Sequence, residues 1–230
     1  FREFLAWIVG ADKKFVIIAN KNCITYKEVF PLIKENKIWC GVSGFTKDIL
    51  FIPASKIEVD ENRKSATKIV NDEVFLRSPS IWITNLDHGR RHQPLQLMSM
   101  ADNIKFSKHK EIKGRQYAHY DNYDAIEVPF TDAIPNDYEG VMGVPISFLD
   151  KYCPEQFEIL GITKTWFEKL KTKIYPEQIQ VSKNGNKTAV TKLNDGATIK
   201  IEQPVDDTYY IVDGEMFIQT YARILIRKKQ

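Results

Sequence analysis

The hydrophobic residues near the N-terminus alternate between helical and strand-like spacing. Apolar side chains from Arg2 to Val9 recur as on one face of a helix. Phe15 to Ala19 is a continuous apolar run, which predicts a central parallel strand covered on both faces. A capping-box pattern at Thr25-Tyr-Lys-Glu28 then predicts a helix from Tyr26 to about Lys34, disturbed at Pro31.

Further apolar runs extend this α/β pattern to about residue 104. Ile38 to Val42 completes a strand-helix-strand order, which favours a right-handed crossover. Val74 to Leu76, Ile81 to Thr84 and Leu95 to Met98 are predicted strands, and the last two are expected to form a hairpin. The polar segment from Ser55 to Asp72 shows little periodicity and is expected to be an exposed connection. The early part therefore indicates an α/β sheet that ends in a hairpin.

The late part of the chain is dominated by strands. Phe157 to Ile162 is a predicted strand, Thr163 to Lys173 a predicted helix, and Pro145 to Tyr152 a short helix with its proline in the first turn. Beyond residue 176 the turn signals are Asn184-Gly185, Asn194-Asp195-Gly196 and Asp213-Gly214. They predict a C-terminal antiparallel β meander with strands at Ile179–Ser182, Thr188–Leu193, Ala197–Glu202, Tyr209–Val212 and Met216–Ile226.

Polar chemistry is concentrated directly after the strand at Ile81 to Thr84. Asn85 to His92 contains an amide, a carboxylate, two imidazoles, two guanidiniums and a glycine. Loops at strand ends carry function more often than strands do. The alternative is a salt-bridged turn in which Asp87 pairs with Arg90 or Arg91, and the sequence does not separate the two. The two histidines have no third ligand nearby, so a metal site is not expected.

Composition narrows the class of protein. The 230 residues are 43% hydrophobic and 12% aromatic, which is enough for a large core in one domain or two smaller ones. Three cysteines without CxxC spacing are expected to be reduced thiols. No apolar run reaches the roughly 18 residues of a membrane span and no signal peptide is recognised. We therefore expect a cytoplasmic protein with no membrane partner.

Charge is distributed in blocks. The net charge of +3 is too small to imply a polyanion partner, so a nucleic-acid site must depend on local clustering. Lys105 to Arg115 is such a basic cluster, and it indicates either a solvated face or a phosphate-binding surface. Tyr120 to Tyr152 is acidic and punctuated by prolines, so we expect it to wrap a folded body. Its spacing matches no calcium-binding loop.

Several long blocks resemble one family, the EcoRI-type adenine-specific DNA methyltransferases. They occur in family order, cover roughly residues 1 to 162, and are joined by a similar stretch from Tyr221 to Arg227. From Thr163 to about Gln219 little is similar. The blocks that carry the resemblance are Lys13–Asn22, Ile24–Glu28, Pro31–Asn36, Trp82–His92 with Pro94, Tyr120–Glu127 and Asp137–Tyr152.

The resemblance implies transfer of a methyl group from S-adenosylmethionine to the exocyclic amine of adenine, on a Rossmann-like class I sheet. The family's Asn/Asp-Pro-Pro-Phe/Tyr catalytic motif lies just ahead of a helix resembling Arg2 to Val9, and it does not stand in this sequence. A glycine-rich cofactor turn is missing as well. We therefore expect the C-terminal portion of such an enzyme, inactive and not binding S-adenosylmethionine by itself. Residues 1–104 would be the second half of the catalytic domain and residues 105–230 a DNA-contacting α+β extension.

The resemblance also directs the choice of site residues. Asn20 and Asn22 follow a strand end, where α/β sheets bind ligands, so they are placed near the adenine and cofactor pocket; turn formation is the slightly favoured alternative. The implied partners are double-stranded DNA and a cognate restriction endonuclease. A non-catalytic DNA-binding or specificity module, or a purely structural protein, stays an alternative. The residues expected to bind DNA are Asn85, His88, Arg90, Arg91, His92, Lys108, Lys110 and Lys113.

Overall fold

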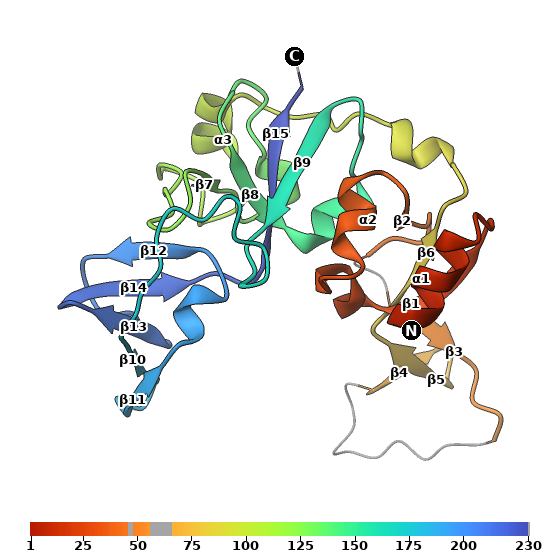
Figure 1. Cartoon of the computed structure of the whole chain (residues 1–230), viewed down its shortest axis with the longest axis horizontal. Helices are drawn as coiled ribbons and strands as arrows, with labels where there is room; N and C mark the ends of the chain where they lie inside the picture. Colours follow the sequence, from red (N-terminus) through yellow and green to blue (C-terminus); the bar gives the residue numbers. More distant parts are fainter. Residues whose placement is uncertain (46–47, 56–65, 230) are drawn as a thin grey trace. The chain divides into compact units, whose positions relative to one another are not determined.

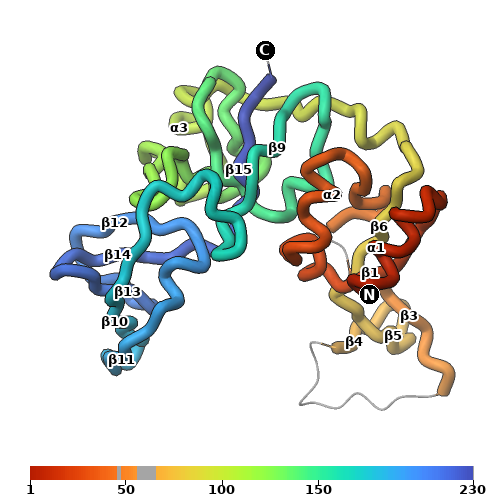
Figure 2. The backbone as a smooth tube through the Cα atoms, in the orientation of Figure 1, coloured from red at the N-terminus to blue at the C-terminus, as the bar shows by residue number. Residues whose placement is uncertain are grey.

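A computed structural model describes residues 1–45, 48–55 and 66–229 of the chain. The chain divides into two compact units, Phe1–Arg91 and His92–Gln230, and each is described by itself (Figure 1, Figure 2). The boundary expected between residues 104 and 105 falls inside helix α3 (Met100–Phe106) of the second unit. The expected assignment of a catalytic part to residues 1–104 and a DNA-contacting extension to residues 105–230 stays a prediction. None of the helices in the described ranges is long and apolar enough to cross a membrane.

The first unit contains a three-stranded sheet in the order β1-β6-β2. Its strands are β1 (Val16–Asn20), β6 (Ser80–Thr84) and β2 (Trp39–Cys40), and both pairings are antiparallel. The prediction of a central parallel strand at Phe15 to Ala19 is therefore wrong, because β6 takes the centre and β1 lies at an edge. The expected cover on both faces is also wrong, since Val16 and Ile18 are 53% and 40% exposed. The neighbours of a strand are chosen by the whole fold and not by its own run of apolar residues.

Helix α1 (Arg2–Gly10) is confirmed, although Leu5 is the helical side chain that it buries. A short 3-10 helix, η1 (Lys21–Thr25), follows β1, and α2 covers Phe30–Lys34. The helix expected from Tyr26 thus begins later, because the hydroxyl of Thr25 donates to the carbonyl of Asn22 at 2.9 Å instead of capping a helix. Proline lies in the first turn of α2, where its missing N–H costs nothing.

A second sheet in the first unit has the order β3-β5-β4 and is antiparallel throughout. It consists of β3 (Ile49–Phe51), β4 (Thr67–Val70) and β5 (Glu73–Ser78). The exposed connection expected from Ser55 to Asp72 is wrong for β4, and residues 56–65 lie outside the described residues. The predicted hairpin with Leu95 to Met98 is also wrong, since those residues form no strand and lead into α3.

The second unit is built on a four-stranded sheet in the order β7-β8-β15-β9. The strand predicted at Phe157 to Ile162 is confirmed as β9. The single strand predicted from Met216 to Ile226 is instead two strands in two sheets, β14 (Glu215–Gln219) and β15 (Arg223–Lys228). The remaining elements of this part are β7 (Ile126–Glu127), η4 (Thr131–Ala133), β8 (Met142–Pro145) and η5 (Ile146–Asp150).

A five-stranded antiparallel sheet completes the second unit, in the order β11-β10-β13-β14-β12. The hairpin turns at Asn184-Gly185 and Asp213-Gly214 are confirmed, and Asp213 and Gly214 have φ angles of 50° and 80°. Asn194 to Gly196 closes no hairpin, because β11 and β12 lie at opposite edges, so the sheet is not a simple meander. The strands are β10 (Gln178–Val181), β11 (Lys187–Val190), β12 (Thr198–Ile201), β13 (Tyr209–Val212) and β14.

The helix predicted from Thr163 to Lys173 is replaced by turns. Phe167 packs so closely on Gly161 of β9 that a Cβ there would approach its ring to 2.3 Å. Lys164 and Lys171 donate to the carboxylate of Asp195 at 2.6 Å and to the carbonyl of Asn194 at 2.9 Å. Lys164 and Lys171 are spaced as on one face of a helix, but they bind the loop at Asn194 and Asp195 instead. No local pattern in the sequence indicates these contacts.

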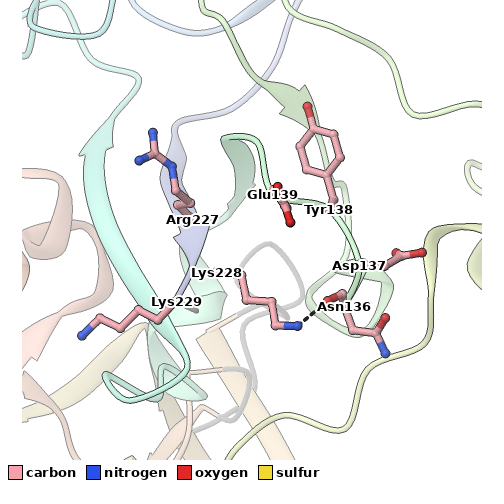
Figure 3. Close-up of a pocket in the computed structure, with 7 residues that line it drawn as sticks. All are labelled: Asn136, Asp137, Tyr138, Glu139, Arg227, Lys228 and Lys229. Carbon is pink, nitrogen blue, oxygen red and sulfur yellow. Dashed lines mark hydrogen bonds between the residues drawn. The ribbon is translucent and has the colours of Figure 1, made fainter.

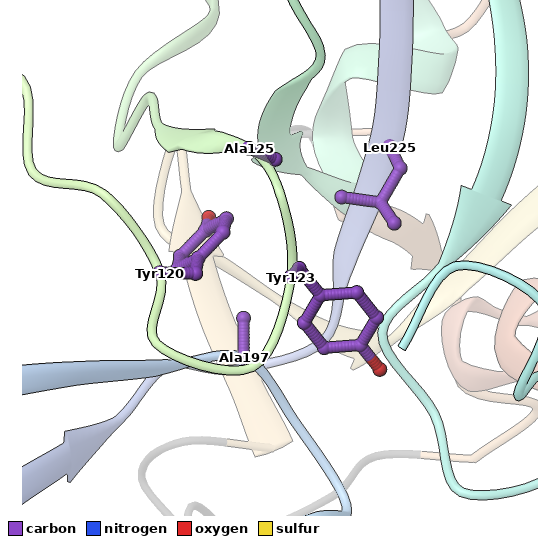
Figure 4. Packing of buried hydrophobic residues seen from close by; sticks show 5 residues of the cluster. All are labelled: Tyr120, Tyr123, Ala125, Ala197 and Leu225. Atoms are coloured by element: carbon purple, nitrogen blue, oxygen red, sulfur yellow. The ribbon is translucent and has the colours of Figure 1, made fainter. Parts of the chain in front are cut away.

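A buried cluster joins the two sheets of the second unit (Figure 4). Asn122 is fully buried beside it and bonds both the carbonyl of Gly196 and the amide of Thr198 at 2.9 Å. The acidic segment thus packs into the folded body, as the sequence indicated. The cluster consists of Tyr120, Tyr123, Ala125, Ala197 and Leu225.

A largely buried ion pair contacts the same cluster through Tyr120. Arg223 donates to both carboxylate oxygens of Glu127 at 2.6 to 3.0 Å, and their side chains are only 13% and 10% exposed. The hydroxyl of Tyr120 donates to the same carboxylate. Burial and this carboxylate raise the pKa of Tyr120 well above its usual value. The pair joins β7 to β15, since Glu127 lies in β7 and Arg223, 96 residues later in the sequence, lies in β15.

Candidate nucleic-acid interface

The loop of residues 85–92 begins where β6 ends, and its first residues hold β1 in place. The hydroxyl of Thr84 donates to the carbonyl of Phe15 at 2.7 Å. Asn85 accepts from the amide of Phe15 at 3.0 Å and donates to the carbonyl of Lys13 at 2.9 Å. Both ends of the Asn85 amide group therefore bond to the backbone just before β1, which fixes the orientation of this side chain.

The middle of the loop is attached to β2 and to the residues after it. Nε2 of His88 lies 2.9 Å from the carbonyl of Cys40, and Arg90 donates to the carbonyl of Val42. The indole of Trp39 donates to the carbonyl of Leu86 at 2.9 Å. The loop forms a 3-10 turn, η3 (Gly89–His92), rather than the tip of a hairpin. Side chains of the loop bond the backbone of β2 and the residues after it, and the Trp39 side chain of β2 bonds the backbone of the loop.

Arg91, one of the predicted DNA-binding residues, has a largely enclosed side chain. Its guanidinium lies over the ring of Trp39 with 3.9 Å between carbon and centroid, and it donates to Oδ1 of Asn36 at 2.8 Å. It also lies 3.6 Å from the carboxylate of Asp87, and its side chain is 11% exposed. This is the salt-bridged turn that the sequence offered as the alternative to a site. Arg91 therefore braces the first unit.

His92 belongs to the second unit. Its Nδ1 lies 2.8 Å from the carboxylate of Glu155, which also accepts from the thiol of Cys153 at 3.2 Å. The bonds from Cys153 and from His92 lower the pKa of Glu155. The loop thus belongs to both units, with Asn85 to Arg91 in the first and His92 in the second.

In the basic segment, one carboxylate neutralises part of the charge. Lys108 and His109 both lie 2.8 Å from oxygens of Asp132, and the imidazole of His109 stacks on Phe130 with 3.7 Å between centroids. Burial acts to raise the pKa of Asp132, but the bonds from Lys108 and His109 outweigh it and the pKa is lowered. Lys108 is therefore paired with a carboxylate of the same chain, and no local pattern predicted this partner.

Lys110 and Lys113 are exposed, and within the described residues neither forms an ion pair. They stand on a tight turn closed by the bond from the amide of Lys113 to the carbonyl of His109 at 2.9 Å. Gly114, at a φ of 73°, then directs its amide back to Ile104 at 2.8 Å. Both lysines therefore present an accessible charge that no ion pair with a described residue neutralises.

The two asparagines after β1 form a turn. Oδ1 of Asn20 accepts from the amide of Asn22 at 2.9 Å and so caps η1. This is the turn that the sequence offered as the alternative to a pocket residue, and the sequence contains no glycine-rich strand-end turn. Within the described ranges no three His, Cys, Asp or Glu side chains gather as metal ligands would.

A groove of about 350 Å³ in the second unit was missed from the sequence (Figure 3). The end of β15 supplies Arg227, Lys228 and Lys229, and the facing loop runs from Asn136 to Glu139. Lys228 donates to the carbonyl of Asn136. The basic C-terminal run was the available signal, but only the fold places it opposite the carboxylates of this loop, which leaves the groove with mixed charge.

Comparisons with known proteins find the same family that the sequence blocks resemble. A family model described as adenine-specific methyltransferase EcoRI matches residues 1–229. The Type II methyltransferase M.EcoRI of Escherichia coli is 44% identical over 176 residues, which is 74% of this chain and 49% of the relative. M.MpnI of Mycoplasma pneumoniae is 31% identical over 162 residues, or 70% of this chain and 47% of the relative.

A third relative matches along the whole chain. The Type II methyltransferase M.MgeORF184P of Mycoplasma genitalium is 28% identical over 231 residues, which covers 100% of this chain and 62% of the relative. The chain thus spans about half to three fifths of the length of these relatives. No solved structure matches the chain.

Proposed function

Because the chain belongs to the adenine-specific methyltransferase EcoRI family, we propose that it takes part in methyl transfer from S-adenosylmethionine to the exocyclic amine of adenine in double-stranded DNA. The observation that carries the proposal is the extent of the family match, which covers residues 1–229 and so includes both units. The names of the three relatives, all Type II methyltransferases, support it. Since the chain covers 47% to 62% of those relatives, the activity belongs to the intact protein in this proposal.

The first unit would supply the end of a Rossmann-like class I sheet. In support, β1 and β2 both run antiparallel to β6, so they share one direction, and η1 and α2 form the crossover between them. The strand β6 lies between β1 and β2 and runs antiparallel to both. This order is compatible with a mostly parallel sheet whose last strands include one that runs in the opposite direction. S-adenosylmethionine and the reacting adenine would be held mainly by residues beyond those of this chain.

The second unit would contact DNA. Lys110 and Lys113 are the first candidates for phosphate contacts, because they are exposed and form no ion pair with described residues. Lys108 would contribute less, since Asp132 lies 2.8 Å from its ammonium group. In the first unit the loop from Asn85 to Arg91 would act mostly as a brace beside the sheet.

Methyl transfer is tested on the protein at its natural length. The purified protein is incubated with unmethylated plasmid and S-adenosylmethionine carrying a labelled methyl group, and the DNA is digested to nucleosides. We expect the label in N6-methyladenine and none from residues 1–230 alone. Label in cytosine, or no label in DNA, would overturn the proposed function.

A non-catalytic DNA-binding module is the second candidate, because the sequence contains neither a glycine-rich strand-end turn nor the family's Pro-Pro-aromatic motif. It predicts that the protein at its natural length transfers no methyl group and that residues 1–230 bind duplex DNA with or without S-adenosylmethionine. Fluorescence anisotropy on a labelled duplex over a range of salt concentrations measures that binding. Methylation by the intact protein would eliminate this candidate.

A further inference from the structure

Helix α3 of the second unit ends in an exposed aromatic ring. Phe106 is the last residue of this helix and is 59% exposed, whereas Asn103 on the same helix is fully buried. A single exposed apolar side chain is common on protein surfaces, so its meaning depends on what surrounds it. Two properties of the surroundings distinguish Phe106: a fixed backbone and a high density of cations.

The backbone on both sides of Phe106 is held by buried contacts. The turn after the helix folds back onto it, because the amide of Gly114 donates to the carbonyl of Ile104 at 2.8 Å. Ile112 is 3% exposed and anchors the same turn in the core. The ring is therefore presented to solvent by a fixed helix end. A ligand that takes it up would pay little for ordering the chain.

Cationic side chains lie on both sides of this ring in the sequence. Nζ of Lys105 lies 4.9 Å from the centroid of the Phe106 ring. Within residues 105–115 the only carboxylate is Glu111, while Asp132 pairs with part of the charge. Asp102 of α3 accepts from the hydroxyl that caps the start of the helix, at 2.7 Å. The exposed cations of the segment are Lys105, Lys108, Lys110, Lys113 and Arg115. The ring thus stands in a surface with more positive than negative charge.

We propose that Phe106 inserts between base pairs of duplex DNA beside the target adenine, while the cations of residues 105–115 bind the neighbouring phosphates. The inference rests on the proposed function. Cationic side chains bind the phosphate backbone, and proteins that open or kink a duplex insert apolar side chains between base steps. An apolar ring on a fixed support among cations combines both requirements in one short segment.

Such an insertion would assist methyl transfer. The exocyclic amine of adenine is paired inside the duplex, so the base must leave the stack before it reacts. A ring that stacks on the base pairs beside the vacated position stabilises this open state, and aromatic stacking does not depend on the identity of the base. Phe106 is therefore a positioning residue in this proposal. It does not touch the methyl group and acts by raising the fraction of DNA in which the adenine is extruded.

The test measures single-turnover methylation by the natural-length protein, on a duplex with one adenine that the plasmid assay shows to be methylated. Phe106→Ala should slow this reaction about tenfold, whereas Phe106→Trp should keep the rate because an indole also stacks. In a second duplex the target adenine faces an abasic position, so the base is already free to leave the stack. There the deficit of Phe106→Ala should fall below about twofold. The salt dependence of DNA binding should not change, because no charge is removed.

Tyr221→Ala is the matched control. Tyr221 is an aromatic residue of the same unit and is 90% exposed. It lies just before β15, whereas Lys228 at the other end of that strand donates to Asn136, whose amide donates to the carbonyl of Met98 just before α3. Loss of this distant ring should leave the rate on both duplexes unchanged. Circular dichroism confirms that each variant is folded.

Three results would overturn the role of Phe106. They are an unchanged rate in Phe106→Ala, an equal deficit on both duplexes, and an equal deficit in Tyr221→Ala. A protein that methylates no DNA removes the proposed function, and insertion is then judged in bound plasmid without S-adenosylmethionine. Permanganate oxidises unstacked thymines, so reactive thymines should appear with the unsubstituted protein and disappear with Phe106→Ala. Equal reactivity with both proteins would remove the insertion as well.

Discussion

The substitution Arg91→Ala tests whether Arg91 stabilises the fold or binds DNA. In the folded chain the guanidinium stacks on Trp39 at 3.9 Å, donates to Asn36 at 2.8 Å and lies 3.6 Å from Asp87. Its side chain is 11% exposed, so truncation leaves a gap beside the indole, while water can replace the guanidinium at the exposed amide oxygen of Asn36. The substitution should therefore destabilise the first unit.

The expected cost is about 2 kcal/mol. A partly desolvated cation–π contact contributes about 1 kcal/mol, and the hydrogen bond to the exposed Asn36 contributes about 1 kcal/mol. The ion pair with Asp87 adds little, about 0–0.5 kcal/mol, because that carboxylate is 63% exposed. Arg91→Lys keeps the charge and loses the planar stack and fork, so its cost should be about 1 kcal/mol.

Urea unfolding followed by tryptophan fluorescence measures this cost, since three of the four tryptophans, Trp7, Trp39 and Trp82, lie in the first unit. Lys110→Ala is the control and should change the unfolding free energy by less than about 0.5 kcal/mol. At a temperature where Arg91→Ala is folded, its affinity for duplex DNA should match that of the unsubstituted chain. Unchanged stability with greatly weakened DNA binding would refute the structural role and restore Arg91 as a contact.

Three further outcomes are expected. Glu127→Gln leaves the buried guanidinium of Arg223 without its counter-charge and should cost the second unit about 3–5 kcal/mol, measured by hydrogen exchange in β8 and β15; a cost below about 1 kcal/mol would contradict this. Gly143→Ala brings a methyl group to 2.3 Å from a buried tyrosine hydroxyl and should cost about 1–3 kcal/mol, so an unchanged melting temperature would be inconsistent with the packing. Combining Lys110→Ala with Lys113→Ala should lower the slope of log affinity against log salt by about 1.8, with unfolding unchanged; an unaltered slope would remove both lysines from the interface.

The local elements that the sequence predicted correctly are those whose signals are self-contained. Helix α1 has its apolar spacing within nine residues, and β9 is bounded by turn residues on both sides. The hairpin at Asp213-Gly214 needs two consecutive positive φ angles, which this dipeptide adopts at low cost. Each of these decisions depends on residues that are neighbours in the chain.

The candidate site was predicted less completely, because the same residue types serve two purposes. The composition of the loop from Asn85 to His92 fits a DNA contact and a braced turn equally well. Arg91 became a brace only when Trp39 and Asn36 were placed beside it, more than 50 residues away in the chain. Lys110 is still a candidate for a DNA contact because the fold left it exposed.

The sequence by itself determined the family and the mixture of helices and strands, since long blocks that resemble one family and local periodicity need no coordinates. Only the tertiary structure decided that β6, rather than β1, is the central strand of its sheet. It also decided that Met216 to Ile226 divides between two sheets and that Glu127 meets Arg223. The physical reason is that strand neighbours and buried partners are selected by competition among all apolar faces and charges at once, and their separation along the chain carries no local signal.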